Sequence, residues 1–163
     1  KKKAYRYTKS GKLYSPRQGI YAIDQKYDRL ELATKVYKPA YISFETVLRQ
    51  QGVIFQYSSA ITIASYLTRS LTIDGQIYEY HKLKSGILFD PAGIDNSGAF
   101  AIACVERALL DTIYLYTHYY FDHLSMVNWD KVEAILPAYG GNRRMRETVD
   151  ILRQSVEEPN HAD

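Results

Sequence analysis

The stretch ITIASYLTRSLTIDGQIYEYHKL, residues 61–83, decides the fold class of this chain. Two of its segments, residues 61–67 and 71–73, are rich in residues that favour β-strands, and residues 76–83 alternate as a half-buried strand does. The Asp74-Gly75 pair before the last segment favours a two-residue hairpin turn, because both residues tolerate positive φ angles. The stretch therefore predicts a small antiparallel sheet.

Segments with a helical period lie on both sides of this sheet. The longest apolar pattern, residues 99–121, repeats every three or four residues and predicts the central buried helix. The fold class is therefore α+β, a small antiparallel sheet packed with several helices. Further helices are expected at residues 28–37, 44–51, 129–136 and 143–154, with Ser43 and Asn128 as caps, a strand at residues 86–89 and a loop at residues 91–98.

Charged residues interrupt the apolar pattern of the central helix. Arg107 and Asp111 are four residues apart, a spacing at which opposite charges pair on a helix surface. We expect this ion pair on the exposed side of the helix. The alternative is that Glu106, Arg107 and Asp111 form a polar contact site for a partner.

The segment GKLYSPRQGIYAI, residues 11–23, has the pattern of a β-hairpin. Short β-forming runs at residues 13–15 and 20–22 flank Pro16-Arg17-Gln18-Gly19, in which Pro restricts one φ angle and Gly permits the reversal. Arg17 makes the tip of this hairpin positive.

The segment KKKAYRYTKS, residues 1–10, precedes the hairpin. As a helix it places Lys2, Arg6 and Lys9 on one face, and Gly11 would end it in the left-handed conformation. A basic helix followed by a basic hairpin is the back half of a winged helix. We therefore interpret residues 1–25 as a partial winged helix.

Charge is unevenly distributed along the chain. Residues 1–17 hold seven of the 21 Lys and Arg residues and no Asp or Glu, whereas the rest holds fourteen against all 18 acidic residues. This segregation indicates an edge that binds a polyanion, and the alternative is a solvated terminus without a role. The predicted DNA-binding residues are Lys2, Lys3, Arg6, Lys9, Lys12 and Arg17, and Arg143, Arg144 and Arg146 form either a second basic face or a solvated surface.

Composition narrows the class of protein further. No apolar run reaches the roughly 20 residues that span a bilayer, so we expect a soluble protein without a membrane partner. The single cysteine, Cys104, lies in an apolar stretch, which favours the reducing cytoplasm over secretion. We expect most of the sixteen tyrosines to pack against the core with their hydroxyl groups in water.

Signals for catalysis are weak. His81, His118 and His123 lack neighbours at metal-ligand spacing, and Cys104 lacks a nearby base, so neither a metal site, a cofactor nor a small-molecule substrate is expected. A metal-dependent nuclease is the most tempting alternative, since such enzymes hold acids and a lysine on adjacent strands. Its constellation would be Asp74, Glu79 and Lys82, but Glu79 and Lys82 are three residues apart and point to opposite faces of a strand.

Four segments together carry a family resemblance. They are GKLYSPRQGIYAI, LATKVYKPAYISFETVLRQQGVI, ITIASYLTRS with DGQIYEYHKL, and IACVERALLDTIYL. In this order they resemble the AbiEi family, the antitoxin and transcriptional-repressor half of bacterial abortive-infection toxin-antitoxin pairs. The resemblance covers about residues 11–155, and PAYISFETVL and ERALLD are its most specific parts.

The resemblance implies a function and a domain organisation. Similar proteins bind operator DNA through an N-terminal winged helix, repress their own operon, and carry an α+β domain that counteracts a nucleotidyltransferase-like toxin without obligatory tight contact. We therefore expect a non-enzymatic antitoxin and autorepressor, with an α+β domain at residues 26–156 and a disordered tail at residues 157–163. The alternative is a protein-interaction module that binds a partner directly.

The front of the chain departs from the family pattern. A whole winged helix has about 60 residues, including two helices before the recognition helix. Only the tail of the recognition helix and the hairpin are represented here. Two expectations stay open: the chain is a shortened form of a longer regulator, or this member has lost the part that recognises sequence.

Overall fold

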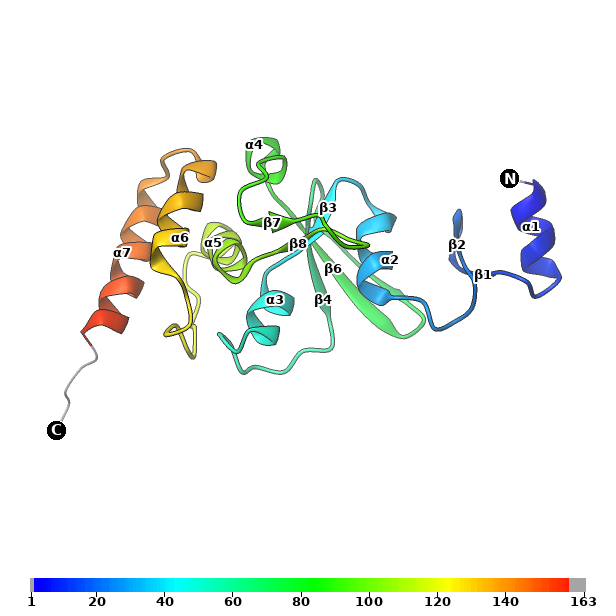
Figure 1. Ribbon diagram of the computed structural model, residues 1–163, viewed down its shortest axis with the longest axis horizontal. Coiled ribbons are helices and arrows are strands. Elements are labelled where there is room, and N and C mark those ends of the chain that lie inside the picture. Colours follow the sequence, from blue (N-terminus) through cyan, green and yellow to red (C-terminus); the bar gives the residue numbers. More distant parts are fainter. Residues whose placement is uncertain (1, 159–163) are drawn as a thin grey trace.

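The computed structural model describes residues 2–158, which form a mixed α+β fold as predicted. The elements lie along an elongated molecule, with α1 at one end and α7 at the other (Figure 1). The helices are α1 (Lys2–Lys9), α2 (Arg29–Val36), α3 (Glu45–Gln50), α4 (Ser85–Leu88), α5 (Val105–Leu115), α6 (Trp129–Ile135) and α7 (Arg143–Glu157), with a 3-10 turn, η1 (Leu136–Tyr139). The strands are β1 (Tyr14–Arg17), β2 (Ile20–Ala22), β3 (Ala40–Ile42), β4 (Ile61–Ser65), β5 (Arg69–Ile73), β6 (Gln76–Lys82), β7 (Ile94–Asp95) and β8 (Ile102–Ala103).

The central sheet is larger than predicted and mixed rather than antiparallel. Its six strands have the order β5-β6-β4-β3-β8-β7. The Asp74-Gly75 turn joins β5 and β6 as an antiparallel hairpin, but β6 then pairs in parallel with β4, with Ile61 opposite Tyr78. Because β4 is buried along its whole length, it needs a strand on each edge, and β3 and β6 supply them.

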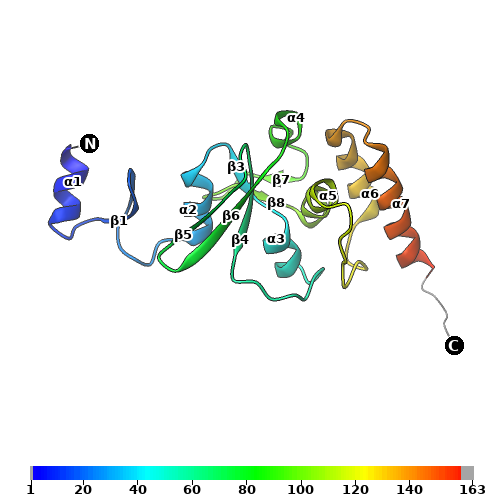
Figure 2. The same ribbon diagram turned by 180° about the vertical axis from the view of Figure 1, so that it is seen from behind.

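Helices cover both faces of this sheet. Helix α2 lies on one side, where the Tyr80 hydroxyl donates a 2.6 Å hydrogen bond to the Ala33 carbonyl. Helices α3 and α5 lie on the other side, and α6 and α7 pack beyond α5 (Figures 1 and 2). The core therefore runs from α2 through the sheet to α7.

Two predictions between β6 and α5 are wrong in detail. Residues 86–88 belong to the single-turn helix α4 and Phe89 is its C-cap, so residues 86–89 do not form a strand. Ile87 and Leu88 are both buried, and their N–H groups both donate to the Lys84 carbonyl, which closes a helical turn. The expected loop at residues 91–98 contains β7, which pairs antiparallel with β8.

The helix ends confirm some of the predicted caps and boundaries and not others. Asn128 caps α6 as predicted, accepting from the Lys131 N–H at 3.1 Å. Ser43 does not cap α3: Phe44 precedes that helix at φ 56°, and the Ser43 hydroxyl points into the core. Helix α7 begins at Arg143 as predicted but continues through Glu157, so that residue is not part of a tail, and residues 159–163 lie outside the described residues.

The central helix α5 is buried on all sides, which corrects one expectation. Arg107 and Asp111 form the predicted ion pair, with 3.3 Å between Nε and Oδ1, but both side chains are fully buried rather than exposed. Asp111 also accepts hydrogen bonds from the hydroxyls of Tyr41, Ser43 and Tyr139. The sheet, α3, α6 and α7 surround this helix, so its charged residues join core elements instead of facing solvent.

The tyrosines range from buried to exposed, and several, such as Tyr14 and Tyr27, are half-buried. Four of them, Tyr41, Tyr78, Tyr80 and Tyr139, are buried, and three of these hydroxyls hydrogen-bond inside the protein rather than to water. Others, such as Tyr57 and Tyr120, are largely exposed. Across residues 2–158, no helix is long and apolar enough to cross a membrane.

Candidate nucleic-acid interface

The N-terminal module, defined here as residues 2–25, begins with α1. Its end follows the prediction: Gly11 adopts φ 73°, its N–H donates to the Thr8 carbonyl, and the Lys12 N–H donates to Tyr7. These bonds satisfy carbonyls that the last helical turn leaves open. The glycine therefore turns the chain directly from the basic helix into the hairpin.

The hairpin pairs β1 with β2. Pro16 and Arg17 belong to β1, so the turn is two residues, Gln18 and Gly19, instead of the four predicted. Proline fits there because this strand is at an edge, where its missing N–H removes no ladder bond. The Ser15 hydroxyl bonds the Ile20 carbonyl at 3.0 Å and ties the strands together.

No residue of the N-terminal module is buried; the first buried residue of the described chain is Leu32. The module projects from the body at the end opposite α7 (Figure 2). Because it has no core, most of its residues are exposed and the others are half-buried. All six predicted DNA-binding residues are exposed, and within residues 2–158 none has a carboxylate in ion-pair distance: Lys2, Lys3, Arg6, Lys9, Lys12 and Arg17.

Aromatic rings lie beneath several of these cations. The Lys9 ammonium is 5.4 Å from the centroid of the Tyr5 ring, and the Lys12 ammonium is 6.0 Å from that of Tyr7. Tyr5 is 60% exposed. Cations and exposed rings together suit a nucleic acid, which offers phosphates to the first and bases or sugars to the second.

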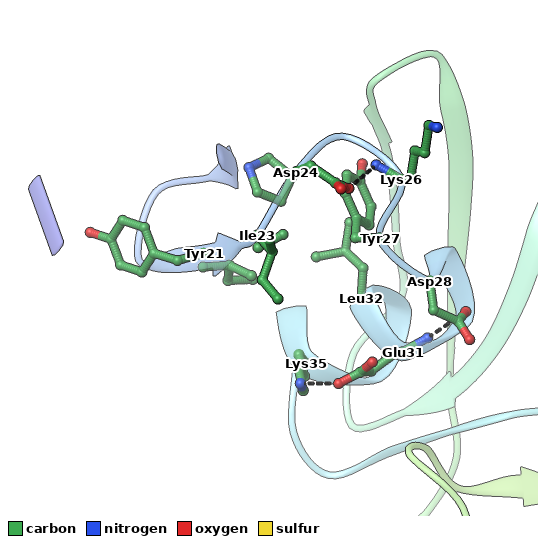
Figure 3. A pocket seen from close by; sticks show the side chains of 12 residues that line it. Tyr21, Ile23, Asp24, Lys26, Tyr27, Asp28, Glu31, Leu32 and Lys35 are labelled. Carbon is green, nitrogen blue, oxygen red and sulfur yellow. Dashed lines mark hydrogen bonds and ion pairs between the residues drawn. The ribbon is translucent and has the colours of Figure 1, made fainter. Parts of the chain in front are cut away.

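A cleft separates the hairpin from α2 (Figure 3). Its volume is about 440 Å³, and Ile23, which is 85% exposed, lines it together with Leu32. Charged groups surround it: the Lys26 N–H donates to Asp24, and Lys35 pairs with Glu31 (Figure 3). The cleft thus lies between the module and α2, while the half-buried Ile20 packs against the core.

Asp74 makes a direct link between the module and the sheet. Its two carboxylate oxygens accept hydrogen bonds from Tyr14 at 2.8 Å and Tyr27 at 2.6 Å. These bonds, that of Tyr27 first, lower the pKa of Asp74 below its ordinary value. The sequence signalled only the Asp-Gly turn, because its two partners lie 60 and 47 residues away.

The nuclease constellation is not brought together. Asp74 is occupied by tyrosine hydroxyls, and along β6 the half-buried Glu79 alternates with the buried Tyr78 and Tyr80, placing Glu79 and Lys82 on opposite faces as predicted. Among residues 2–158, no three His, Cys, Asp or Glu side chains are grouped to hold a metal ion.

The possible second basic face on α7 differs from the module. Arg143 pairs with Glu147 at 2.7 Å, and Arg146 pairs with Glu133 at 2.6 Å. Arg144 donates to the carbonyls of Tyr114 and Tyr116. Each of the three guanidinium groups therefore has a partner within the protein.

The remaining candidates have structural surroundings. Cys104 caps α5, its sulfur accepting from the Arg107 N–H, and burial raises the pKa of its thiol. Burial lowers the pKa of His81, which packs against the Phe44 ring. A protonated thiol and a neutral imidazole on separate elements do not form a nucleophile–base pair.

Sequence reasoning missed an apolar surface on two loops. Loop residues 51–60 and 117–128 are tied together: the Asp122 and His123 N–H groups donate to Val53, and the Phe55 N–H donates to the Asp122 carboxylate. No periodic pattern marks these loops, so exposure is the only sign of them. Four large apolar side chains project from them into solvent: Phe55, Tyr57, Tyr120 and Met126.

Comparisons with known proteins add no assignment to this geometry: no protein-family model matches the chain, and no curated protein matches it at a significant level.

Proposed function

We propose that this protein is a DNA-binding regulator of the AbiEi type, an antitoxin that represses its own operon and counteracts a nucleotidyltransferase-like toxin. One observation carries the DNA-binding half. Six exposed cations lie on a projecting module, and no carboxylate of the described chain neutralises them. The antitoxin half is supported by the resemblance of residues 11–155.

DNA phosphate is the polyanion that this surface fits best. A duplex presents closely spaced phosphates, and each one that a Lys or Arg side chain neutralises releases a counterion. Arg17, beside the hairpin turn, and Lys9 and Lys12, at the junction of α1 with the hairpin, are spread over both parts of the module. Such contacts position a protein on DNA without reading its sequence, so we expect a strong dependence on salt and modest sequence preference.

The mode of action is binding rather than catalysis, and the compartment is the bacterial cytoplasm. Support for the first comes from the nuclease constellation, whose residues point apart. A half-buried Cys104 that serves as a helix cap and whose thiol pKa is raised fits a reducing compartment.

A mobility-shift titration with DNA from upstream of the protein's own operon tests the proposal. In the triple variant Lys9→Gln, Lys12→Gln, Arg17→Gln, affinity at low salt should fall by about 30- to 1,000-fold, because three phosphate contacts are lost. Arg143→Gln with Arg146→Gln is the matched control, since it removes cations that already have partners. Equal affinities for wild type and triple variant would contradict the proposal.

The apolar loops favour a second candidate function, direct binding of a protein partner such as the toxin. Hydrogen bonds hold loops 51–60 and 117–128 in place before any partner arrives, which lowers the entropy that binding costs. The exposed side chains include tyrosine, phenylalanine and methionine, which are enriched at protein interfaces. This surface is separate from the N-terminal module, so both activities can reside in one chain.

Co-purification with the product of the adjacent gene discriminates the two functions. Tyr57→Ser with Tyr120→Ser should abolish a stable complex and leave DNA affinity unchanged. Phe89→Ser is the matched control, because Phe89 is a similarly exposed ring that follows α4, outside these loops. A complex that survives the double substitution would exclude the loops as its interface.

A further inference from the structure

The N-terminal module contacts the body through a few polar groups and one half-buried apolar residue, Ile20, and contributes no fully buried residue. We propose that Asp74 is a positioning residue that fixes the direction in which the module faces. The inference rests on the proposed function for its purpose, since a fixed direction presents the six cations to DNA in one orientation. Its geometry is independent of DNA.

Asp74 accepts hydrogen bonds from one residue of the module and from one residue just after it. The Tyr14 hydroxyl donates to Oδ1 and the Tyr27 hydroxyl donates to Oδ2, so both carboxylate oxygens are used. The two rings are stacked, with centroids 6.2 Å apart and planes 17° from parallel. Tyr14 begins the hairpin, and Tyr27 lies between the hairpin and α2. One carboxylate therefore binds the chain at the start of the hairpin and again after its end.

The acceptor sits on a rigid base. Asp74 and Gly75 have φ angles of 48° and 76°, which suits a two-residue hairpin turn. The strands β5 and β6 on either side are paired without interruption from Arg69 to Ile73, and Ile73 is buried. A carboxylate on such a turn has little freedom to follow the module if the module swings.

Few other contacts compete for this role. The Arg17 guanidinium lies 5.8 Å from the centroid of the Tyr37 ring, and that ring's hydroxyl accepts from Arg69 at 3.0 Å. The cleft separates the hairpin from α2 on one side (Figure 3). Removing the Asp74 contacts leaves the exposed link at residues 23–26, the cation–π contact of Arg17 and the packing of the half-buried Ile20 against the core.

Three variants test the joint, by which we mean the hydrogen bonds of Asp74 with Tyr14 and Tyr27, without disrupting the fold. Tyr14→Phe with Tyr27→Phe removes both donors and keeps the rings. Asp74→Asn keeps a favoured Asn-Gly turn and one carbonyl acceptor, so it should act in the same direction but less strongly. Tyr21→Phe is the control, because Tyr21 is an exposed tyrosine on β2 outside the joint.

Limited digestion of the full chain with trypsin measures the joint without DNA. Cleavage after Lys26 and Arg29 should be roughly three- to tenfold faster in the double tyrosine variant, intermediate in Asp74→Asn and unchanged in Tyr21→Phe. The hydrogen bond to Asp74 is the main cause that raises the pKa of Tyr14. In the Asp74→Asn variant, the ring signal of Tyr14 in NMR should therefore titrate at a lower pH than in wild type.

DNA affinity is then measured on the same variants. Faster cleavage with a three- to tenfold loss of affinity supports the inference, because every phosphate-binding cation remains. Cleavage at the wild-type rate overturns it, and so does faster cleavage with unchanged affinity. If wild type itself does not bind DNA, the proposed function fails, while the cleavage rates and the Tyr14 titration still decide whether Asp74 holds the module.

Discussion

The N-terminal module and the helical end formed by α5, α6 and α7 use the same residue types in opposite ways. In the module, six cations are exposed without a carboxylate partner among the described residues. At the helical end, Arg107 and Arg146 pair with carboxylates, and Arg144 binds backbone carbonyls. Charge in the first region is available to a partner, and charge in the second is already used by the fold.

The difference shows that a run of basic residues does not by itself indicate a surface that is available to a partner. The segments around Arg6 and Arg144 are both helices with several basic residues, which are Lys and Arg in α1 and Arg alone in α7. What distinguishes them is burial: α7 buries Met145 and Val149 against the body, which brings its arginines to Glu133 and to the end of α5, whereas α1 buries nothing. A functional basic surface is one that the fold leaves unneutralised.

The largest expected difference between the two regions is in the free energy of unfolding after one cation is removed from each. Arg107→Met leaves Asp111 buried without its ion-pair partner, so the free energy of unfolding should fall by about 3–5 kcal/mol. Lys12→Met, in the module, should change it by less than about 0.5 kcal/mol. Urea unfolding followed by circular dichroism measures both, and similar losses would show that module cations also serve the fold.

Lowering the pH is expected to have an intermediate effect on the free energy of unfolding, through Glu106. Burial raises the pKa of Glu106, but hydrogen bonds from the backbone and the nearby Lys131 outweigh it, so the pKa lies below its ordinary value of 4.5. Glu106 therefore contributes stability that is present above this ordinary value and is lost as the pH falls through the lower, folded-state pKa.

Glu106→Gln tests this contribution. At pH 7 it should cost about 1–2 kcal/mol of unfolding free energy, and the urea midpoint should then fall less steeply from pH 5 to pH 3 than in wild type. Asp24→Asn, in the exposed module, is the control and should leave the pH profile unchanged. If the urea midpoint of Glu106→Gln falls as steeply from pH 5 to pH 3 as that of wild type, this carboxylate is not the cause of the loss of stability in acid.

The smallest effect is expected at the surface of α7. Arg143→Gln with Arg146→Gln breaks two exposed ion pairs, which contribute about 0–1 kcal/mol each. DNA affinity should change less than twofold, because these side chains are already engaged. A loss of affinity comparable to that of the module variant would instead identify α7 as a second DNA-binding face.

Local signals predicted much of the fold. Gly11, Asn128 and the Asp74-Gly75 turn act as expected, because each is decided by backbone conformation within a few residues. The exposed cations of the module were also predicted, since no apolar stripe accompanies them.

Long-range pairing limited the rest. The parallel contact between β4 and β6 could not be read from three consecutive strands, which suggest a meander. Arg107 and Asp111 were placed on the surface because an i, i+4 pair is usual there, and only the assembled core shows that Tyr41 and Tyr139 complete their hydrogen bonds. Asp74 finds its tyrosine partners through the same kind of distant contact.

The salt dependence of DNA affinity, measured by fluorescence anisotropy, tests the central claim most directly. If the module's free cations meet phosphates, the slope of log K against log salt concentration should be about −4 to −5 for wild type. It should be shallower by about 2 to 3 in the Lys9→Gln, Lys12→Gln, Arg17→Gln variant. The same slope in both proteins would contradict the account.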